Sequence, residues 1–164
     1  MVVRFRAAGP RDAEAIALIY NEGIAERIAT FETRPRTAGE IQDWFGSGYP
    51  ILVVEEAGTV ISFANTSAYS TRECYSGVAE FSVYTASDAR GRGAGTLAMK
   101  ALMEAAEEVG IWKLVARVFL ENAPSRKLLH SLGFREVGVH EKHARLDGIW
   151  RDVVVVERLI KANL

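Results

Sequence analysis

The segment from residue 78 to 85 holds the side chains whose types and spacing are best suited to acid–base chemistry. Glu80 lies in an otherwise apolar run, and Ser82 and Tyr84 follow it at intervals of two. Alternate residues of a strand point to the same face, so these three side chains are expected to lie together. A partly buried carboxylate at this position is a candidate general base. The alternative is a glutamate on an edge strand that simply faces water.

A glycine-rich turn follows that strand and is expected to open a helix. Its sequence is Arg90-Gly91-Arg92-Gly93-Ala94-Gly95-Thr96. Glycines allow the backbone to approach a ligand closely, and the N–H groups at a helix start attract phosphate. The P-loop pattern Gly-x-x-x-x-Gly-Lys-Ser/Thr is absent here. The loose dinucleotide pattern that starts at Gly93 comes too late in the chain for a doubly wound sheet to follow it.

The hydrophobic pattern predicts the elements that must position these residues. Strands are expected over 3–7, 51–56, 59–69, 78–85, 113–119, 134–142 and 149–159, and helices over 10–28, 37–45, 96–109 and 122–132. The order β-α-α-β-β-β-α-β-α-β-β is typical of an α/β or α+β sandwich, in which helices cover a mixed sheet. A length of 164 residues and the lack of a long linker predict one domain, residues 1–164.

Composition excludes several classes of function. Twenty Lys and Arg residues balance 21 Asp and Glu residues, and the net charge of −1 argues against nucleic-acid binding or a polybasic membrane anchor. The longest apolar runs are too short to span a bilayer. Cys74 is the single cysteine, so no internal disulfide can form and a cytoplasmic location is expected. The three histidines lack metal-ligand spacing, so we expect no metal.

Two motifs in order resemble those of the GCN5-related N-acetyltransferases (GNAT). Residues 90–95 fit the family's Arg/Gln-x-x-Gly-x-Gly/Ala pyrophosphate loop, and residues 122–134 resemble its second acetyl-CoA segment. The order of elements is also similar to the family fold, a mostly antiparallel sheet of six to seven strands with about four helices. Residues 19–21, 80–84 and 148–152 resemble the branch that acetylates phosphinothricin and methionine sulfone.

The resemblance implies direct transfer of an acetyl group from acetyl-CoA to a primary amine. Glu80 aligns with the glutamate of the branch motif Glu-x-x-Val-Tyr and becomes the predicted general base. The implied coenzyme-binding residues are Val83 and Thr85 on a bulged strand, the loop residues Arg90, Gly91, Arg92, Gly93, Ala94, Gly95 and Thr96, and Asn122 and Ser125 at the next helix.

The group that protonates the departing thiolate is left open. Many relatives carry a tyrosine where this chain has Leu129. Tyr84 or water can supply the proton instead, or the thiolate can leave unprotonated, since a thiol pKa of about 8–9 makes that possible.

The substrate implied by the branch is a small anionic compound resembling an amino acid. Phe31, Arg72 and Tyr75 are predicted to bind it together with Glu80, although a solvated loop explains Arg72 almost as well. A protein N-terminal or ribosomal-protein acetyltransferase and a non-catalytic acetyl-CoA sensor remain the alternatives. The apolar run 149–156 fits either a homodimer interface, which we expect, or a buried strand.

Overall fold

A computed structural model describes residues 2–164 and contains one seven-stranded sheet flanked by helices. The strands are β1 (Val3–Ala7), β2 (Ile51–Glu56), β3 (Thr59–Ala68), β4 (Val78–Thr85), β5 (Lys113–Phe119), β6 (Arg135–Leu146) and β7 (Ile149–Leu159). The helices are α1 (Ala13–Glu26), α2 (Ala38–Gln42), α3 (Ala94–Glu108) and α4 (Ala123–Ser131). The predicted fold class and element order are therefore confirmed, although β6 runs four residues further than 142.

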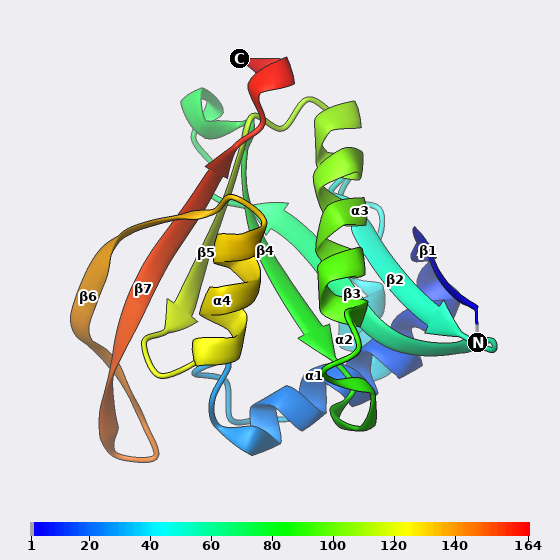
Figure 1. Ribbon diagram of the computed structural model, residues 1–164, viewed down its shortest axis with the longest axis horizontal. Coiled ribbons are helices and arrows are strands. Elements are labelled where there is room, and N and C mark those ends of the chain that lie inside the picture. Colours follow the sequence, from blue (N-terminus) through cyan, green and yellow to red (C-terminus); the bar gives the residue numbers. More distant parts are fainter. Residues whose placement is uncertain (1) are drawn as a thin grey trace.

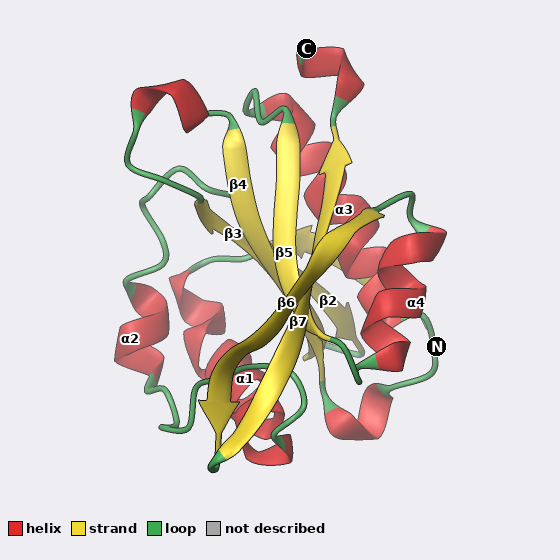
Figure 2. Cartoon of the chain, turned by 90° about the vertical axis from the view of Figure 1, so that its left-hand side faces the viewer, coloured by secondary structure: helices red, strands yellow, loops and turns green. Residues whose placement is uncertain are grey.

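The sheet has the order β1-β2-β3-β4-β5-β7-β6, and β4 and β5 form its parallel pair. Helices α1 and α2 lie on one face of the sheet, and α3 and α4 cover the other (Figure 2). The alternation of β2 explains how both faces are filled. Leu52 and Val54 join the core under α3, whereas Ile51 and Val53 join the core under α1 and α2. Among the helices of residues 2–164, none is long and apolar enough to cross a membrane.

Strands β4 and β5 separate part-way along their length. Their pairing runs from Val78 opposite Lys113 to Glu80 opposite Val115, and beyond that point the strands diverge (Figure 1). The bulge expected near Val83 and Thr85 does not interrupt the β3–β4 register, which is continuous. Because β4 keeps its ladder with β3 while it leaves β5, its other backbone edge is open to a ligand beyond Glu80.

A buried ion pair fixes the start of α1 against the edge of the sheet. Asp12 is 5% exposed, and its two carboxylate oxygens each accept a hydrogen bond from the Arg6 guanidinium at 2.8 Å. The Gly9 backbone N–H donates a third bond at 2.9 Å. These donors favour the ionised form, so they hold the pKa of the Asp12 carboxyl below its ordinary value.

Replacement of Asp12 by Asn is expected to lower the free energy of unfolding by about 2–3 kcal/mol at pH 7, because hydrogen bonds to a charged group are lost. A lowered pKa stabilises the fold above the unfolded pKa of about 3.9, and that contribution disappears as the pH falls through the folded value. Urea unfolding at pH 7 and at pH 3 tests both points. The exposed Asp43→Asn is the control, and a gap between wild type and Asp12→Asn that does not narrow between pH 7 and pH 3 contradicts the assignment.

Candidate active site

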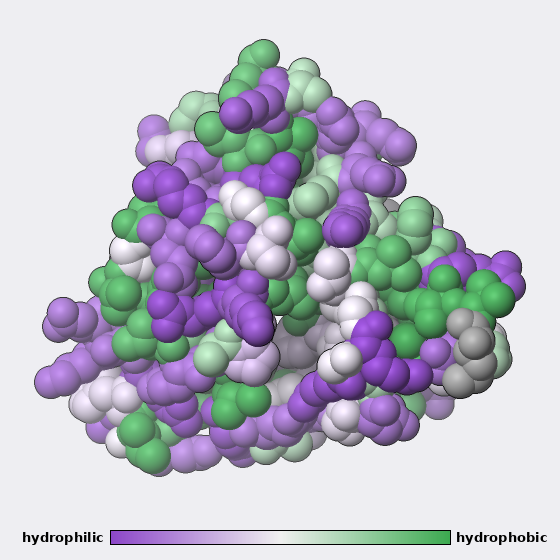
Figure 3. Space-filling model, viewed as in Figure 1, coloured by the Kyte–Doolittle hydropathy of each residue, from purple (hydrophilic) through white to green (hydrophobic). Residues whose placement is uncertain are grey.

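Three adjoining cavities meet where β4 and β5 diverge. We call them the loop cavity, about 360 Å³, the central cleft, about 60 Å³, and the carboxylate cavity, about 500 Å³. Val83 and Ser125 line both the loop cavity and the central cleft, and Ser82, Tyr84 and Arg117 line both the central cleft and the carboxylate cavity. The shared residues join the three into one path across the sheet. The hollow near the middle of the surface in Figure 3 lies between the lower ends of α3 and α4 in Figure 1.

The loop cavity is built from the glycine-rich turn and the first turn of α3. Gly91 and Gly93 have φ angles of +77° and +85°, and a Cβ at either would meet no atom within 4 Å. The N–H groups of Ala94, Gly95 and Thr96 belong to the first helical turn, which has no intrahelical acceptors for them. The result is a backbone cradle with free donors and room for a phosphate group.

Both arginines of the loop are paired with glutamates from other elements. The Arg90 guanidinium donates two hydrogen bonds to the carboxylate of Glu26 on α1, and Arg92 pairs with Glu56 at 3.2 Å. The hydrogen bonds from Arg90 hold the pKa of the Glu26 carboxyl below its ordinary value. Arg92 also does not line the loop cavity. The backbone N–H groups of Ala94, Gly95 and Thr96 are therefore the donors of this loop that no carboxylate occupies.

The central cleft is closed on the α4 side by residues at the start of that helix. The Asn122 side chain accepts a hydrogen bond from the Ser125 backbone N–H at 3.3 Å and donates one to the Ile28 carbonyl at 3.3 Å. Asn122 thus caps α4 and ties it to the segment after α1. Leu129 also lines the cleft and is buried. Its side chain is a hydrocarbon, so this position offers no proton donor.

The carboxylate cavity lies on the α1 face of the sheet, where Glu80 is the last β4 residue paired with β5. Glu80 Oε1 accepts a hydrogen bond from Arg117 Nη2 at 2.7 Å, and the two side chains are 33% and 52% exposed. Phe31 and His143 line the same cavity. The predicted Glu80 and Phe31 are therefore brought together. Arg117 was not predicted, although a charged residue inside the alternating apolar strand 114–119 was a usable signal.

The comparisons with known proteins show to which family the chain belongs. The acetyltransferase (GNAT) family model matches residues 16–134. The chain belongs to the GNAT family. It is an N-acetyltransferase that uses acetyl-CoA as donor, which confirms the resemblance found in the sequence.

Individual relatives extend over nearly the whole acetyltransferase. A methionine sulfoximine and methionine sulfone acetyltransferase of Pseudomonas aeruginosa is 33% identical, over 96% of this chain and 94% of that protein. The structure of a phosphinothricin acetyltransferase from Sinorhizobium meliloti in complex with acetyl-CoA has a TM-score of 0.90 at 29% sequence identity. The match covers 97% of this chain and 89% of that chain. The structure of a ribosomal-protein-alanine N-acetyltransferase from Brucella melitensis has a TM-score of 0.91 at 29% sequence identity. The match covers 96% of this chain and 99% of that chain.

The side chain of Tyr84 in this acetyltransferase is enclosed by other aromatic rings. It stacks on Phe63 at a centroid distance of 5.5 Å and meets the edge of Tyr20 at 5.1 Å. The ring packs so closely on α1 that a Cβ at Gly23 would lie 2.7 Å from it. Burial raises the pKa of the Tyr84 phenol, so this hydroxyl is a weaker acid than that of an exposed tyrosine.

The connection between α1 and α2 forms one wall of the carboxylate cavity of the acetyltransferase. The Asn21 side chain accepts a hydrogen bond from the Arg36 N–H at 2.8 Å and donates one to the Arg36 carbonyl at 3.0 Å. This clasp holds the end of the connection close to α1. Within this connection, Phe31 packs edge-on against Phe119 of β5, and the two ring centroids are 4.8 Å apart.

Arg72 and Tyr75 are not brought to the carboxylate cavity. Both lie in the connection between β3 and β4, where the Arg72 guanidinium sits over the Tyr75 ring at 5.6 Å and Tyr75 meets the edge of Tyr69. Neither residue lines the cavity that contains Glu80. Their place in the sequence, a few residues before Glu80, predicted a proximity that the folded chain does not produce.

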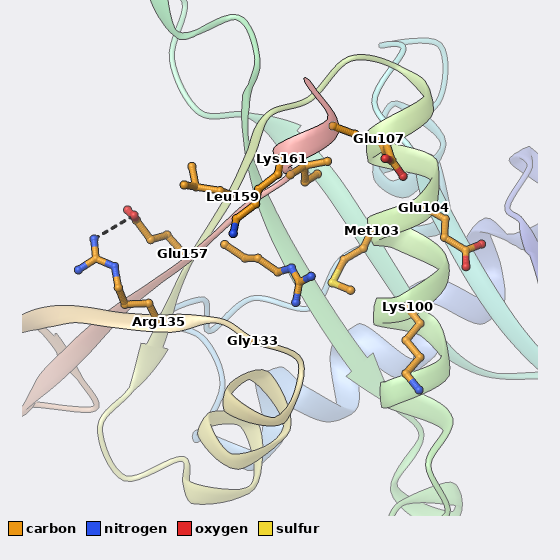
Figure 4. A pocket seen from close by; sticks show the side chains of 12 residues that line it. Lys100, Met103, Glu104, Glu107, Gly133, Arg135, Glu157, Leu159 and Lys161 are labelled. Carbon is orange, nitrogen blue, oxygen red and sulfur yellow. Dashed lines mark hydrogen bonds and ion pairs between the residues drawn. The ribbon is translucent and has the colours of Figure 1, made fainter. Parts of the chain in front are cut away.

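A further cavity of the acetyltransferase, about 700 Å³, lies away from this path, beside the second half of α3 and the end of β7 (Figure 4). Its walls carry both signs of charge, from Lys100, Glu104, Glu107, Arg135, Glu157 and Lys161. Arg135 and Glu157 neutralise one another at 3.0 Å. This cavity contains none of the predicted site residues.

Proposed function

We propose that the protein acetylates the amine of a small anionic amino acid, such as phosphinothricin, methionine sulfone or methionine sulfoximine. The observation that carries this proposal is the carboxylate cavity, in which Glu80 and its partner Arg117 lie beside the cleft that leads to the loop cavity. A cavity of about 500 Å³ with Phe31 in its wall suits a small acceptor better than a peptide chain. The names of the Pseudomonas and Sinorhizobium relatives point to the same substrates.

In this proposal acetyl-CoA lies along the path formed by the loop cavity and the central cleft. Backbone N–H groups of residues 90–96 bind its pyrophosphate, as the cradle geometry supports. The open edge of β4 near Val83 and Thr85 meets the pantetheine arm and the thioester oxygen, where backbone donors stabilise developing negative charge. Asn122 and Ser125 contact the arm from the α4 side.

The acceptor amine enters from the carboxylate cavity and attacks the thioester carbonyl directly. It arrives as an ammonium ion, and Glu80 accepts the proton that must leave before the nitrogen can attack. The new C–N bond forms as the C–S bond breaks, and the electron pair of that bond stays on sulfur. The thiolate then leaves as such or takes a proton from water or from the Tyr84 phenol, although the raised pKa of that phenol disfavours the transfer.

We further propose that the enzyme works in the cytoplasm as a homodimer. The run 149–156 splits into two parts, since Val153, Val154 and Val156 fill the core while Ile149 and Trp150 are exposed. Val137 and Val139 of the edge strand β6 are exposed as well. These exposed apolar side chains near an unpaired strand edge support self-association.

Thiol release from acetyl-CoA in the presence of chosen acceptors tests the proposed function. We expect kcat/KM for phosphinothricin or methionine sulfone to exceed that for ribosomal-protein N-terminal peptides and aminoglycosides by at least about tenfold, because only the amino acids place an anion beside the amine. Faster acetylation of a peptide would favour the activity named for the Brucella relative instead. Binding of acetyl-CoA without thiol release for any amine would indicate a sensor.

A further inference from the structure

Arg117 is the feature of the carboxylate cavity that the mechanism above does not use. Parallel pairing places Glu80 opposite Val115, and residues in register share a face of the sheet, so Arg117, two positions further, projects to the same face as Glu80. The strands diverge at that point, and the guanidinium reaches across the opening to the Glu80 carboxylate. Among the described residues that line this cavity, Arg117 is the one with a permanent positive charge.

We propose that Arg117 determines acceptor specificity by binding the α-carboxylate of the substrate while Glu80 receives its α-ammonium group. This inference rests on the proposed function and deepens it, because it defines the acceptor as an amine with a free carboxylate on the same carbon. Phosphinothricin and methionine sulfone meet that description. Peptide N-termini, aminoglycosides and polyamines do not.

The geometry of the ion pair suits a zwitterion. An α-amino acid carries its two charges on either side of one carbon, and the Glu80–Arg117 pair presents the opposite two charges in direct contact at 2.7 Å. The Glu80 carboxylate, the substrate ammonium group, the substrate carboxylate and the Arg117 guanidinium then alternate in sign around a ring, so each group attracts both of its neighbours. The hydrogen bond engages one donor of the guanidinium and one carboxylate oxygen, which leaves the remaining donors and the second oxygen for the substrate.

Exposure of the pair is consistent with a binding role. Arg117 is 52% exposed and Glu80 33%, so water covers both groups until a ligand displaces it. An exposed ion pair contributes little to folding stability. The pair is therefore better explained by what it can bind than by what it stabilises. Phe31 and Phe119 lie on the same cavity wall and offer apolar contact to the rest of the substrate.

Two acceptors that differ only at the carboxylate test this role, namely methionine sulfone and its α-carboxamide. The amine pKa differs between them, so the informative quantity is how the acid-to-amide ratio of kcat/KM changes between wild type and variant. We expect wild type to prefer the acid and Arg117→Gln to lower the ratio by about 10- to 150-fold, mainly through KM of the acid. Arg117→Lys should restore part of the ratio, because the charge remains without the planar fork.

Controls separate this role from others. Arg135→Gln, which removes an exposed guanidinium that is ion-paired with Glu157 and does not line the carboxylate cavity, should leave the ratio unchanged. Urea unfolding and KM for acetyl-CoA should match wild type in Arg117→Gln. If Arg117 acted only by holding Glu80, kcat for acid and amide would fall by the same factor and the ratio would persist, which overturns the inference.

The wild-type enzyme alone distinguishes failure of the proposed function from failure of this inference. Acetylation of both acceptors with no preference for the acid, or with a preference that survives Arg117→Gln, leaves an amino-acid acetyltransferase in place and rejects Arg117 as the carboxylate-binding residue. Acetylation of neither acceptor, with turnover of a peptide or an aminoglycoside, rejects the proposed function and this inference with it.

Discussion

Replacement of Glu80 by Gln is expected to lower kcat by about 10²- to 10⁴-fold at pH 7, the range that general-base catalysis typically contributes. Gln keeps the size of the side chain and an oxygen that can still accept the hydrogen bond from Arg117. It cannot accept a proton from the ammonium group. The loss should shrink as the pH rises through the pKa of the amine, because more of the acceptor is then already neutral.

The measurement is kcat against pH for both enzymes, under conditions in which chemistry limits the rate. KM for acetyl-CoA should be unchanged, because the coenzyme cradle is formed by a separate segment, residues 90–96. Glu136→Gln is the matched control, since Glu136 also pairs with an arginine, Arg126, but on the surface. A loss of less than tenfold near pH 7 would remove Glu80 from the proton-transfer step.

Replacement of Gly93 by Asp is expected to weaken acetyl-CoA binding by about 10³-fold. Gly93 is the N-cap residue of α3, and its φ of +85° places it where the backbone faces the loop cavity. A carboxylate about 4 Å from one pyrophosphate charge costs about 4 kcal/mol at an effective dielectric constant of 20, before any steric conflict is added. The fold should tolerate Asp, because Asp is a favoured N-cap residue and is enriched among residues with positive φ.

Gly93→Asn is the control that isolates charge, since Asn has nearly the shape of Asp and a similar tolerance of positive φ. Calorimetric titration with acetyl-CoA compares the three proteins, and urea unfolding verifies that both variants fold. We expect Gly93→Asn to retain far more affinity for acetyl-CoA than Gly93→Asp. Equal affinities for wild type and Gly93→Asp would mean that the pyrophosphate binds elsewhere.

Several parts of the site follow from short stretches of sequence, because they are formed by neighbours in the chain. The glycine-rich turn, the start of α3 and the Asn122 cap of α4 depend on local backbone preferences, and each lies where the pattern predicts it. The side of β4 that carries Glu80 and Tyr84 follows from alternation alone. The same local signals predicted the fold class.

Tertiary structure decided the pairings between segments that are distant in sequence. Arg90 and Arg92 look free in the sequence, yet Glu26 and Glu56 occupy them, and Arg117 meets Glu80 across 37 positions. Side-chain pairing across a sheet depends on strand order, register and divergence, none of which residue spacing encodes. The separation of β4 from β5 is likewise a property of the assembled sheet, in which the two strands pair only as far as Glu80. The sequence alone thus determined which groups can do the chemistry, and the packing of the sheet determined which of them meet.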